Sequence, residues 1–448
     1  MRALKIGISG VRGIVGETFS PELAVDFAQA FAAYASAGRI LICRDPRPSG
    51  PMVASAVAAG LLAAGCEVID LGLCPTPSLQ LAIPWLGAQG GIAITGGHNA
   101  AQWNALKFVR PDGLYLNAAQ ASELLDIYHQ HEFDKAPWDH MRPMVARNDA
   151  VDHHLEVLSR SFDIAAIRRR PLRVAVDCCN GACSLLAPRW ITALGAIGLT
   201  INDDVNAPFP HDPEPRPDTM AQVRALVQAA GADLGLVLDA DGERLGLVDE
   251  TGRILSEEVT FALAAAVRLN QRAGPIVTNL STSGMVDRIA IAYQAQVFRT
   301  PVGQANVSEA VLEHHAVLGG EGNGSVIAPE IQAVPDSAAT MGILLEYLAL
   351  TGDPLSALAD RLPRLSMIKS AVPVASHLIY STLQAFRDRV QDDCGDVDWS
   401  DGVRIDWPDG WVHVRVSNTE SIIRVIAEAE QESRALELSD WARERLHT

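Results

Sequence analysis

Apolar residues recur with two different spacings in the first hundred residues, and the two spacings alternate along the chain. Segments 21–34 and 50–65 repeat apolar residues every three or four positions, which predicts helices. Segments 38–45 and 66–72 are short apolar runs of the kind found in buried strands. Because few residues separate these elements, the pattern favours a largely parallel sheet covered by helices.

The same alternation restarts twice further along the chain. A second block runs from 172 to 250 and ends in a strand, an acidic turn and another strand. A third block begins near residue 256 and includes apolar runs at 274–280 and 316–327. We therefore expect three α/β domains in series, with mixed, largely parallel sheets.

The last segment has a different pattern. Residues 401–430 alternate apolar and polar positions around Asp-Gly turns, and a helical pattern follows at 432–446. This predicts a small α+β domain with antiparallel strands, joined to the rest by a linker near 362–374. The expected domain ranges are 1–148, 149–252, 253–365 and 366–448.

Composition and charge narrow the class of protein. A chain of 448 residues is too long for one hydrophobic core, which agrees with several domains. Acidic residues outnumber basic ones by 54 to 36, and the net charge of −18 disfavours binding to nucleic acid or to an anionic membrane. No segment has the apolar length of a signal peptide or a membrane span, so we expect a cytoplasmic protein.

Seven cysteines are present, and three of them lie close together in the segment 177–183. They lack paired CxxC spacing, so reduced cysteines that pack in the core are favoured over a metal cluster.

An acidic loop is predicted directly after the apolar run that ends at residue 238. Asp239, Asp241 and Glu243 occupy alternate positions there. Carboxylates with this spacing can converge on a hard divalent cation. An acidic hairpin turn that faces water has the same spacing, so the pattern alone leaves both interpretations open.

A second polar loop lies in the C-terminal segment. Ser417, Asn418 and Thr419 lie between Arg415 and Arg424. Hydroxyls, backbone amides and a forked guanidinium together suit a phosphate monoester. A polar hairpin loop without a ligand is the alternative.

A third loop combines glycines with two polar side chains. Glu321 and Asn323 lie among four glycines, which would let the backbone approach a ligand while the side chains bind its hydroxyls. Glycine loops are common, so this motif is weak by itself.

A fourth loop follows the apolar run 91–94, at the strand end where open α/β sheets usually hold ligands. Its polar side chains are His98, Asn99, Asn104 and Lys107. Gly96 and Gly97 have no side chains, so only their backbone atoms could contact a ligand. The loop therefore has the surroundings of an active site without an obvious reactive side chain.

In this order, the four loops resemble those of the α-D-phosphohexomutases, which include phosphoglucomutase, phosphomannomutase and phosphoglucosamine mutase. The resemblance covers essentially the whole chain and includes GISGVRGIVG near the start, RDPRPSG at 44–50, HDPEPRPD at 211–218 and TPVGQANV at 300–307. It implies four domains around a central cleft and the interconversion of hexose 6-phosphate and hexose 1-phosphate, the hexose being glucose, mannose or glucosamine. It also implies Mg²⁺, a hexose 1,6-bisphosphate activator, and a monomer or homodimer.

The resemblance assigns roles to residues of this chain. It implies Mg²⁺ at Asp239, Asp241 and Glu243; substrate binding by Arg244, Glu321 and Asn323; and phosphate binding by Arg415, Ser417, Asn418, Thr419 and Arg424. Arg12, His98 and Lys107 match family residues near the transferred phosphate, and Lys107 is a candidate for proton transfer.

One position departs from the family in a way that affects the chemistry. A family serine in a Ser-His-Asn-Pro motif carries the phosphate, and the aligned residues here are Gly97, His98, Asn99 and Ala100. Nucleophilic catalysis needs an atom that can form the covalent intermediate, and glycine has none. Glu243 is one methylene longer than the aspartate of the family, and Gln304 replaces a histidine found in some members.

Three interpretations of Gly97 remain open at the level of the sequence. The protein is a non-catalytic relative that binds a sugar phosphate, an active mutase in which Thr95 or His98 accepts the phosphate, or a chain whose serine was replaced deliberately. Binding residues are retained better than transfer residues.

Overall fold

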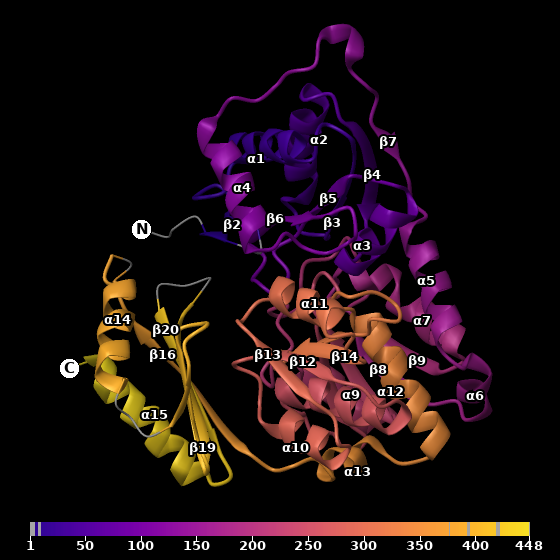
Figure 1. The fold of residues 1–448 in the computed structure, drawn as a ribbon. Coiled ribbons are helices and arrows are strands. Elements are labelled where there is room, and N and C mark those ends of the chain that lie inside the picture. Colours follow the sequence, from indigo (N-terminus) through magenta and orange to yellow (C-terminus); the bar gives the residue numbers. More distant parts are fainter. Residues whose placement is uncertain (1–4, 8–9, 376, 392–394, 418–421, 448) are drawn as a thin grey trace.

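The alternating pattern of the first hundred residues forms a mixed seven-stranded sheet in the computed structural model, which describes residues 5–7, 10–375, 377–391, 395–417 and 422–447 (Figure 1). The strand order is β1-β2-β6-β5-β3-β4-β7. β5, β3, β4 and β7 pair in parallel, whereas β1, β2 and β6 pair antiparallel with their neighbours. The elements are β1 (Lys5–Gly7), β2 (Gly10–Ile14), α1 (Pro21–Tyr34), β3 (Arg39–Arg44), α2 (Gly50–Ala63), β4 (Glu67–Leu73), α3 (Thr76–Trp85), β5 (Gly90–Ile94), β6 (Trp103–Val109), α4 (Ala118–Gln130), a 3₁₀ turn at Trp138–His140 and β7 (Val145–Ala146).

Helix α1 shows why this sequence folds as predicted. Ser20 caps the helix, since its side chain accepts a hydrogen bond from the Leu23 amide at 3.3 Å, and Pro21 has a backbone angle suited to the first turn. Phe27 and Phe31 recur four positions apart, so they lie on one face, and both are buried against the sheet.

The second and third domains each contain a four-stranded sheet, in the orders β11-β10-β8-β9 and β13-β12-β14-β15. The second contains α5 (Ala150–Ser161), α6 (Ile164–Arg169), β8 (Arg173–Asp177), a 3₁₀ turn at Ala182–Leu185, α7 (Ala187–Leu194), β9 (Ile197–Ile201), α8 (Ala221–Ala230), β10 (Leu234–Leu238) and β11 (Leu245–Asp249). The third contains α9 (Glu257–Gln271), β12 (Ile276–Asn279), α10 (Met285–Ala292), β13 (Val297–Thr300), α11 (Gln304–Glu313), β14 (Leu318–Glu321), β15 (Ser325–Ile327), α12 (Ser337–Thr351) and α13 (Leu355–Asp360).

Each of these two sheets ends in an antiparallel hairpin, and the hairpins carry two of the candidate loops. β10 and β11 flank the acidic loop, and β14 and β15 flank the glycine loop. The hairpins meet, because the Leu245 amide donates to the Gly324 carbonyl at 3.0 Å and Arg244 forms a β-bridge with Ser325. The fold therefore places the acidic loop beside the glycine loop.

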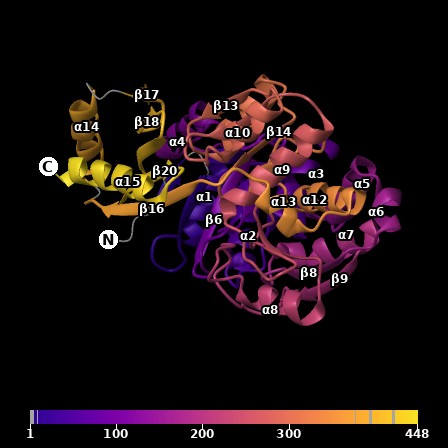
Figure 2. The ribbon, with the colours of Figure 1, turned by 90° about the horizontal axis from the view of Figure 1, so that it is seen from below.

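The C-terminal domain has a sheet of the order β16-β20-β19-β18-β17, and all its pairs are antiparallel. Helices α14 and α15 pack together on one side of it, as Figures 1 and 2 show. Its elements are β16 (Ser366–Pro373), α14 (Ile379–Val390), β17 (Asp396–Asp398), β18 (Val403–Trp407), β19 (Gly410–Val416), β20 (Ile422–Ala429) and α15 (Glu432–His447). The predicted linker near 362–374 is wrong for residues 366–373, which form β16 and pair with β20 along their whole length, whereas residues 361–365 connect α13 to β16.

Polar contacts join the C-terminal domain to the third domain. The Glu428 carboxylate accepts hydrogen bonds from Ser283 and from the Gly284 amide, and Lys369 forms an ion pair with Glu258 at 2.7 Å. By contrast, one continuous apolar core extends through the first three domains and includes Trp190, which is fully buried.

The predicted fold class of three serial α/β domains followed by an α+β domain is confirmed. The strands of each sheet lie inside one of the four expected ranges. Among the helices of the described residues, none has both the length and the apolar character needed to span a membrane.

Candidate active site

A buried arginine shapes the loop that follows β5. The Arg47 guanidinium is 1% exposed and pairs with Asp45 at 2.9 Å. It donates to four backbone carbonyls of the loop, those of Gly97 (2.7 Å), Asn99 (2.6 Å), Ala100 (2.6 Å) and Trp103 (3.1 Å). A Cβ at position 96 would lie 2.8 Å from Arg47 Cζ, so Gly96 is what allows the guanidinium to lie inside the loop.

Gly97 faces the acidic loop of the second domain. A Cβ at this position would lie 3.5 Å from Asp241 Oδ2 and 3.6 Å from Lys107 Nζ, with no closer contact. Its φ of +54° lies in the left-handed region, which glycine adopts without strain. A side chain at position 97 would therefore point at the charged groups that a transferred phosphate would need. Because residue 97 is a glycine, no such side chain is present.

The Thr95 hydroxyl is engaged in holding the same loop. It donates to Asp45 Oδ2 at 2.6 Å and accepts the Gly97 amide at 2.9 Å, and the residue is 2% exposed. A hydroxyl whose proton is bound to a buried carboxylate is poorly placed to attack a substrate phosphate.

The His98 side chain, unlike the Thr95 hydroxyl, has an atom that can accept a bond. Its Nε2 atom lies 3.5 Å from Arg244 Nη2, and since a guanidinium only donates, this nitrogen is the acceptor. Burial lowers the pKa of His98 well below its usual value, and the nearby cations Arg244 and Arg12 lower it further. The imidazole is therefore neutral, with a lone pair directed at Arg244.

Asp239 organises the acidic loop rather than pointing out of it. Its Oδ1 atom accepts the backbone amides of Gly242 (2.9 Å), Glu243 (2.9 Å) and Arg244 (3.2 Å). Burial raises its pKa well above the usual value, as do the neighbouring carboxylates of Asp241 and Glu243.

Lys107 bridges the other two acidic side chains. Its ammonium lies 2.7 Å from Asp241 Oδ2 and 2.8 Å from Glu243 Oε2, and all three residues are buried. Burial acts to lower the pKa of Lys107, but the two carboxylates outweigh it and raise that pKa above its usual value. In this arrangement Lys107 is an ammonium that holds its proton, so its predicted role in proton transfer stays a prediction.

Neighbouring donors hold the same two carboxylates. Thr76 donates to Asp241 Oδ2 at 3.1 Å, and Gln304 Nε2 donates to Glu243 Oε2 at 3.0 Å. The Tyr115 hydroxyl donates to Glu243 Oε1. Glu243 thus joins the first, second and third domains.

These contacts decide whether the loop fits a divalent cation. Asp241 Oδ1 is buried without a hydrogen-bond partner, and it is the one oxygen of Asp241 and Glu243 that the contacts above do not engage. Across the described part of the chain, no three His, Cys, Asp or Glu side chains are placed to hold a metal ion together. The arrangement does not match the predicted Mg²⁺ site at Asp239, Asp241 and Glu243, because the Lys107 ammonium already lies between two of the carboxylates.

The predicted sugar-binding residues lie beside this cluster. Glu321 is 4% exposed, and its Oε1 atom accepts Asn279 Nδ2 at 2.6 Å and the Gly303 amide at 3.3 Å. Asn323 donates to Glu321 Oε2 at 3.4 Å, while its own oxygen accepts the Ser325 hydroxyl at 2.6 Å. The two side chains are thus adjacent and preorganised.

The predicted phosphate-binding arginines face each other in the C-terminal sheet. Arg415 and Arg424 are direct partners in the β19–β20 ladder, so their side chains leave the same face. Arg415 Nε pairs with Asp401 at 2.9 Å, and the same Asp401 oxygen accepts the Val302 amide at 3.0 Å. Ser417 is buried at the end of β19, and Asn418 and Thr419 lie outside the described residues.

The remaining predicted residues are also connected to the Gly97 loop. Arg12 Nη1 donates to Asn99 Oδ1 at 3.2 Å, and burial lowers the pKa of Arg12, as does the nearby Arg244. Arg244 pairs with Glu214 at 2.9 Å. Asn104 instead binds the Ser49 hydroxyl at 2.9 Å and is fully buried, which indicates a structural role.

Two other features are excluded as the site. Ser78, His154 and Asp336 have the residue types of a hydrolase triad, with His154 2.9 Å from Ser78 Oγ and 2.8 Å from Asp336 Oδ2. Each is at most 1% exposed, so no substrate reaches them, and they serve to join the first three domains.

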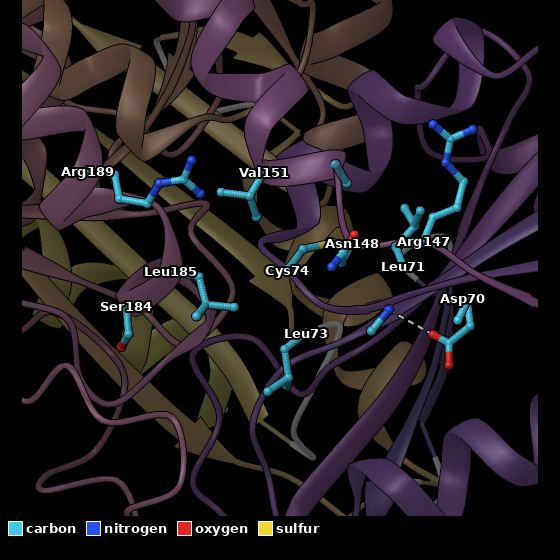
Figure 3. A pocket seen from close by; sticks show the side chains of 13 residues that line it. Asp70, Leu71, Leu73, Cys74, Arg147, Asn148, Val151, Ser184, Leu185 and Arg189 are labelled. Carbon is cyan, nitrogen blue, oxygen red and sulfur yellow. Dashed lines mark hydrogen bonds between the residues drawn. The ribbon is translucent and has the colours of Figure 1, made fainter.

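The second feature is a cavity of about 660 Å³ between the first two domains, shown in Figure 3. The arginines that line it already have partners, Arg147 with Asp149 at 3.0 Å and Arg189 with Asp152 at 2.5 Å. None of the predicted site residues lines this cavity.

Reasoning from the sequence missed several residues that build the site. Arg47 and Asp45 lie within the RDPRPSG segment, which supported the resemblance but carried no assigned role. Tyr115 and Thr76 gave no local signal, because each reaches the acidic loop from a distant part of the sequence.

The six cysteines that the structure describes are buried and free. They pack in the core, and Cys183 does so against the acidic loop, where a Cβ at Gly242 would lie 2.6 Å from its sulfur.

Comparison with known proteins identifies the class that this fold and site define. Family models match in order: phosphoglucomutase/phosphomannomutase α/β/α domain I at residues 3–135, domain II at 152–252, domain III at 256–365, and the C-terminal domain at 367–444. The chain belongs to the phosphoglucomutase/phosphomannomutase family, the α-D-phosphohexomutases.

Relatives named as mutases match nearly the whole chain. A phosphoglucomutase/phosphomannomutase of Thermococcus kodakarensis is 35% identical, with 96% of each chain covered. A phosphoglucosamine/phosphogalactosamine mutase of Sulfurisphaera tokodaii is 32% identical, with 95% of each chain covered.

Solved structures show the same fold. A phosphoglucomutase/phosphomannomutase family protein from Burkholderia thailandensis matches with a TM-score of 0.86 and 27% identity, over 98% of this chain and 96% of that one. An N-acetylphosphoglucosamine mutase of Aspergillus fumigatus, solved with GlcNAc-6P and magnesium, matches with a TM-score of 0.58 and 18% identity, over 91% and 82%.

Proposed function

We propose that this phosphohexomutase-family protein binds a hexose phosphate and does not convert it through a phosphoenzyme at residue 97. The observation that carries the proposal is the position of Gly97. A Cβ at this position would lie at van der Waals distance from Asp241 and Lys107, but glycine has no side-chain atom that could accept a phosphate. The nearest hydroxyl along the chain, that of Thr95, is bound to the buried Asp45 carboxylate.

Retained binding groups support the first half of the proposal. Arg415 and Arg424 place two guanidinium groups on one face of the sheet, and guanidinium groups bind phosphates through charge-assisted hydrogen bonds. Glu321 and Asn323 present paired carboxylate and amide groups suited to adjacent sugar hydroxyls.

A second cationic region suits the other end of a bisphosphorylated or singly phosphorylated hexose. Arg12 and Arg244 lie beside the Gly97 loop, one bound to Asn99 and the other in contact with His98. The chain therefore has cationic side chains both on the C-terminal sheet and beside the Gly97 loop, and neither pair depends on residue 97.

An active mutase with His98 as the phosphate acceptor is the second candidate. It is favoured by the neutral imidazole, whose lone-pair nitrogen lies 3.5 Å from Arg244 Nη2. In such a reaction the nitrogen attacks phosphorus while the P–O bond to the sugar breaks, and the guanidinium stabilises the charge that develops on the phosphoryl oxygens.

Phosphorus NMR of the full-length protein with glucose 1-phosphate tests the proposal. We expect no glucose 6-phosphate, with or without glucose 1,6-bisphosphate and Mg²⁺. Glucose 1-phosphate at millimolar concentration should nevertheless raise the melting temperature. Conversion by the unmodified protein would contradict the proposal, as would an unchanged melting temperature.

A Gly97→Ser variant extends the same experiment. Conversion by this variant alone would place the loss of activity at one position. Conversion by the unmodified protein that is abolished in His98→Gln would establish the second candidate.

Parallel measurements with glucose, mannose and glucosamine phosphates identify the preferred hexose. Glu321 and Asn323 are expected to bind hydroxyls that these three sugars share, so the residues do not select among them. The predictions of a monomer or homodimer and of a cytoplasmic location stay predictions.

A further inference from the structure

The groups around the acidic loop include a cation supplied by the protein itself. The Lys107 ammonium lies 2.7 Å from Asp241 Oδ2 and 2.8 Å from Glu243 Oε2. We propose that this ammonium replaces the divalent cation of the family, so that Asp241 and Glu243 have a cationic partner without a metal ion. The proposal goes beyond sugar-phosphate binding and does not depend on it.

The contacts satisfy three of the four oxygens of the two carboxylates, and the fourth, Asp241 Oδ1, is buried without a hydrogen-bond partner. Lys107 binds one oxygen of each, and the Tyr115 hydroxyl binds the second oxygen of Glu243. Thr76 and Gln304 donate further hydrogen bonds to the oxygens that face the ammonium. Buried charges are tolerated when they are paired and hydrogen-bonded in this way.

The ammonium and a metal ion would compete for the same oxygens. A Mg²⁺ ion needs oxygen ligands at about 2.0–2.1 Å in near-octahedral geometry. Asp241 Oδ2 and Glu243 Oε2 already bind the lysine, and a second cation between them would be repelled by it.

Contacts from two other domains fix the position of Glu243. Its side chain reaches Tyr115 in the first domain and Gln304 in the third, so the carboxylate is held from two sides while it binds the Lys107 ammonium. An aspartate at this position would be one methylene shorter. Glu243, which replaces the family aspartate, and Gln304, which replaces the family histidine, therefore contact each other and together fix this carboxylate.

The ion pairs of Lys107 are related to the missing nucleophile at position 97. Lys107 Nζ would lie 3.6 Å from a Cβ at position 97, so a phosphorylated side chain there would compete for the ammonium. Because Gly97 has no side chain, the ammonium remains free to bind both carboxylates. The loss of the phosphate-bearing residue and the internal cation are thus structurally consistent.

Binding of Mn²⁺, followed by electron paramagnetic resonance on the full-length protein without sugar phosphate, tests the proposal. We expect no Mn²⁺ bound at the acidic loop of the unmodified protein, and the same melting temperature in EDTA and in Mg²⁺. Lys107→Met removes the ammonium and should create a Mn²⁺ site that Asp241→Asn abolishes. Lys135→Met, at an exposed lysine, is the matched control and should bind none.

Two results would overturn the proposal. One is Mn²⁺ bound by the unmodified protein and lost in Asp241→Asn. The other is a folded Lys107→Met variant that still binds no Mn²⁺, because the acidic residues would then not form a cation site even when vacated. If Lys107→Met does not fold by circular dichroism, Lys107→Gln, which keeps a hydrogen-bond donor, is judged by the same criteria.

Discussion

Gly97 and Asp241 face each other across the boundary between the first two domains, and a Cβ on Gly97 would lie 3.5 Å from Asp241 Oδ2. The loop is therefore aimed at the charged cluster even though its reactive side chain is missing. Arg47 fixes that aim through four backbone carbonyls, so the geometry does not depend on the residue at position 97.

Substitutions at the two adjacent glycines should have different costs. Gly97→Ala has room for its methyl group but must keep a φ of +54°, so we expect a loss of about 1 kcal/mol in unfolding free energy. Gly96→Ala places its Cβ 2.8 Å from Arg47 Cζ and should cost about 3 kcal/mol, because the buried guanidinium must move. Urea unfolding of both variants gives the two values, and equal losses would contradict the role assigned to Arg47.

Tyr115→Phe should destabilise the protein without changing its fold. The substitution removes the donor to the buried Glu243 Oε1 and leaves that oxygen unsatisfied, which costs about 1–3 kcal/mol. Tyr380→Phe is the control, because Tyr380 is 75% exposed. The expectation fails if urea unfolding shows the same small effect for both variants.

The contact of the C-terminal domain with the third domain should weaken in acid through His413. Its Nε2 atom donates to the Asp401 carbonyl at 2.7 Å, so Nδ1 accepts the Ser281 hydroxyl at 2.9 Å and the ring is neutral. Burial lowers the pKa of His413 to about 4. Between pH 6.5 and 4 the unfolded chain therefore binds a proton that the folded chain does not.

It follows that stability is lost as the pH falls from 6.5 to 4, by up to about 3 kcal/mol from this group. Urea unfolding across this range, compared with His413→Gln, isolates the contribution. An identical pH dependence in the variant would contradict it.

Arg424 should contribute to phosphate binding. It is exposed and lies opposite Arg415, so Arg424→Gln removes one of the two guanidinium groups proposed to bind a phosphate, which is expected to weaken binding of glucose 6-phosphate about tenfold or more. Arg443→Gln, which removes an exposed arginine in α15, is the control and should leave the affinity unchanged. Calorimetric titration of both variants makes the comparison.

Local patterns predicted the elements well. Helix α1 begins and ends where its sequence pattern does, and the three α/β domains and the antiparallel C-terminal sheet agree with prediction. Strand β16 was taken for a linker, because its eight residues become a strand only through pairing with β20, which comes about fifty residues later.

Some residues of the candidate site were predicted from the sequence and others were not, again because contacts between distant segments leave no local pattern. Motif residues such as Gly97 and Asp241 were found because their neighbours in the sequence identify them. The ammonium of Lys107 and the hydroxyl of Tyr115 reach the acidic loop from more than 120 residues away, and no local pattern encodes that contact. The change from a metal loop to a lysine-bridged loop is therefore visible only in three dimensions.

The intact mass of the protein after incubation with glucose 1,6-bisphosphate, measured without acid so that phosphohistidine survives, shows whether any residue of the protein accepts a phosphate. We expect no covalent phosphate on the unmodified protein, because residue 97 cannot carry one and the Thr95 hydroxyl is engaged by Asp45. A mass increase of one phosphoryl group, lost in His98→Gln, would contradict the claim and show that the protein transfers phosphate through a different residue.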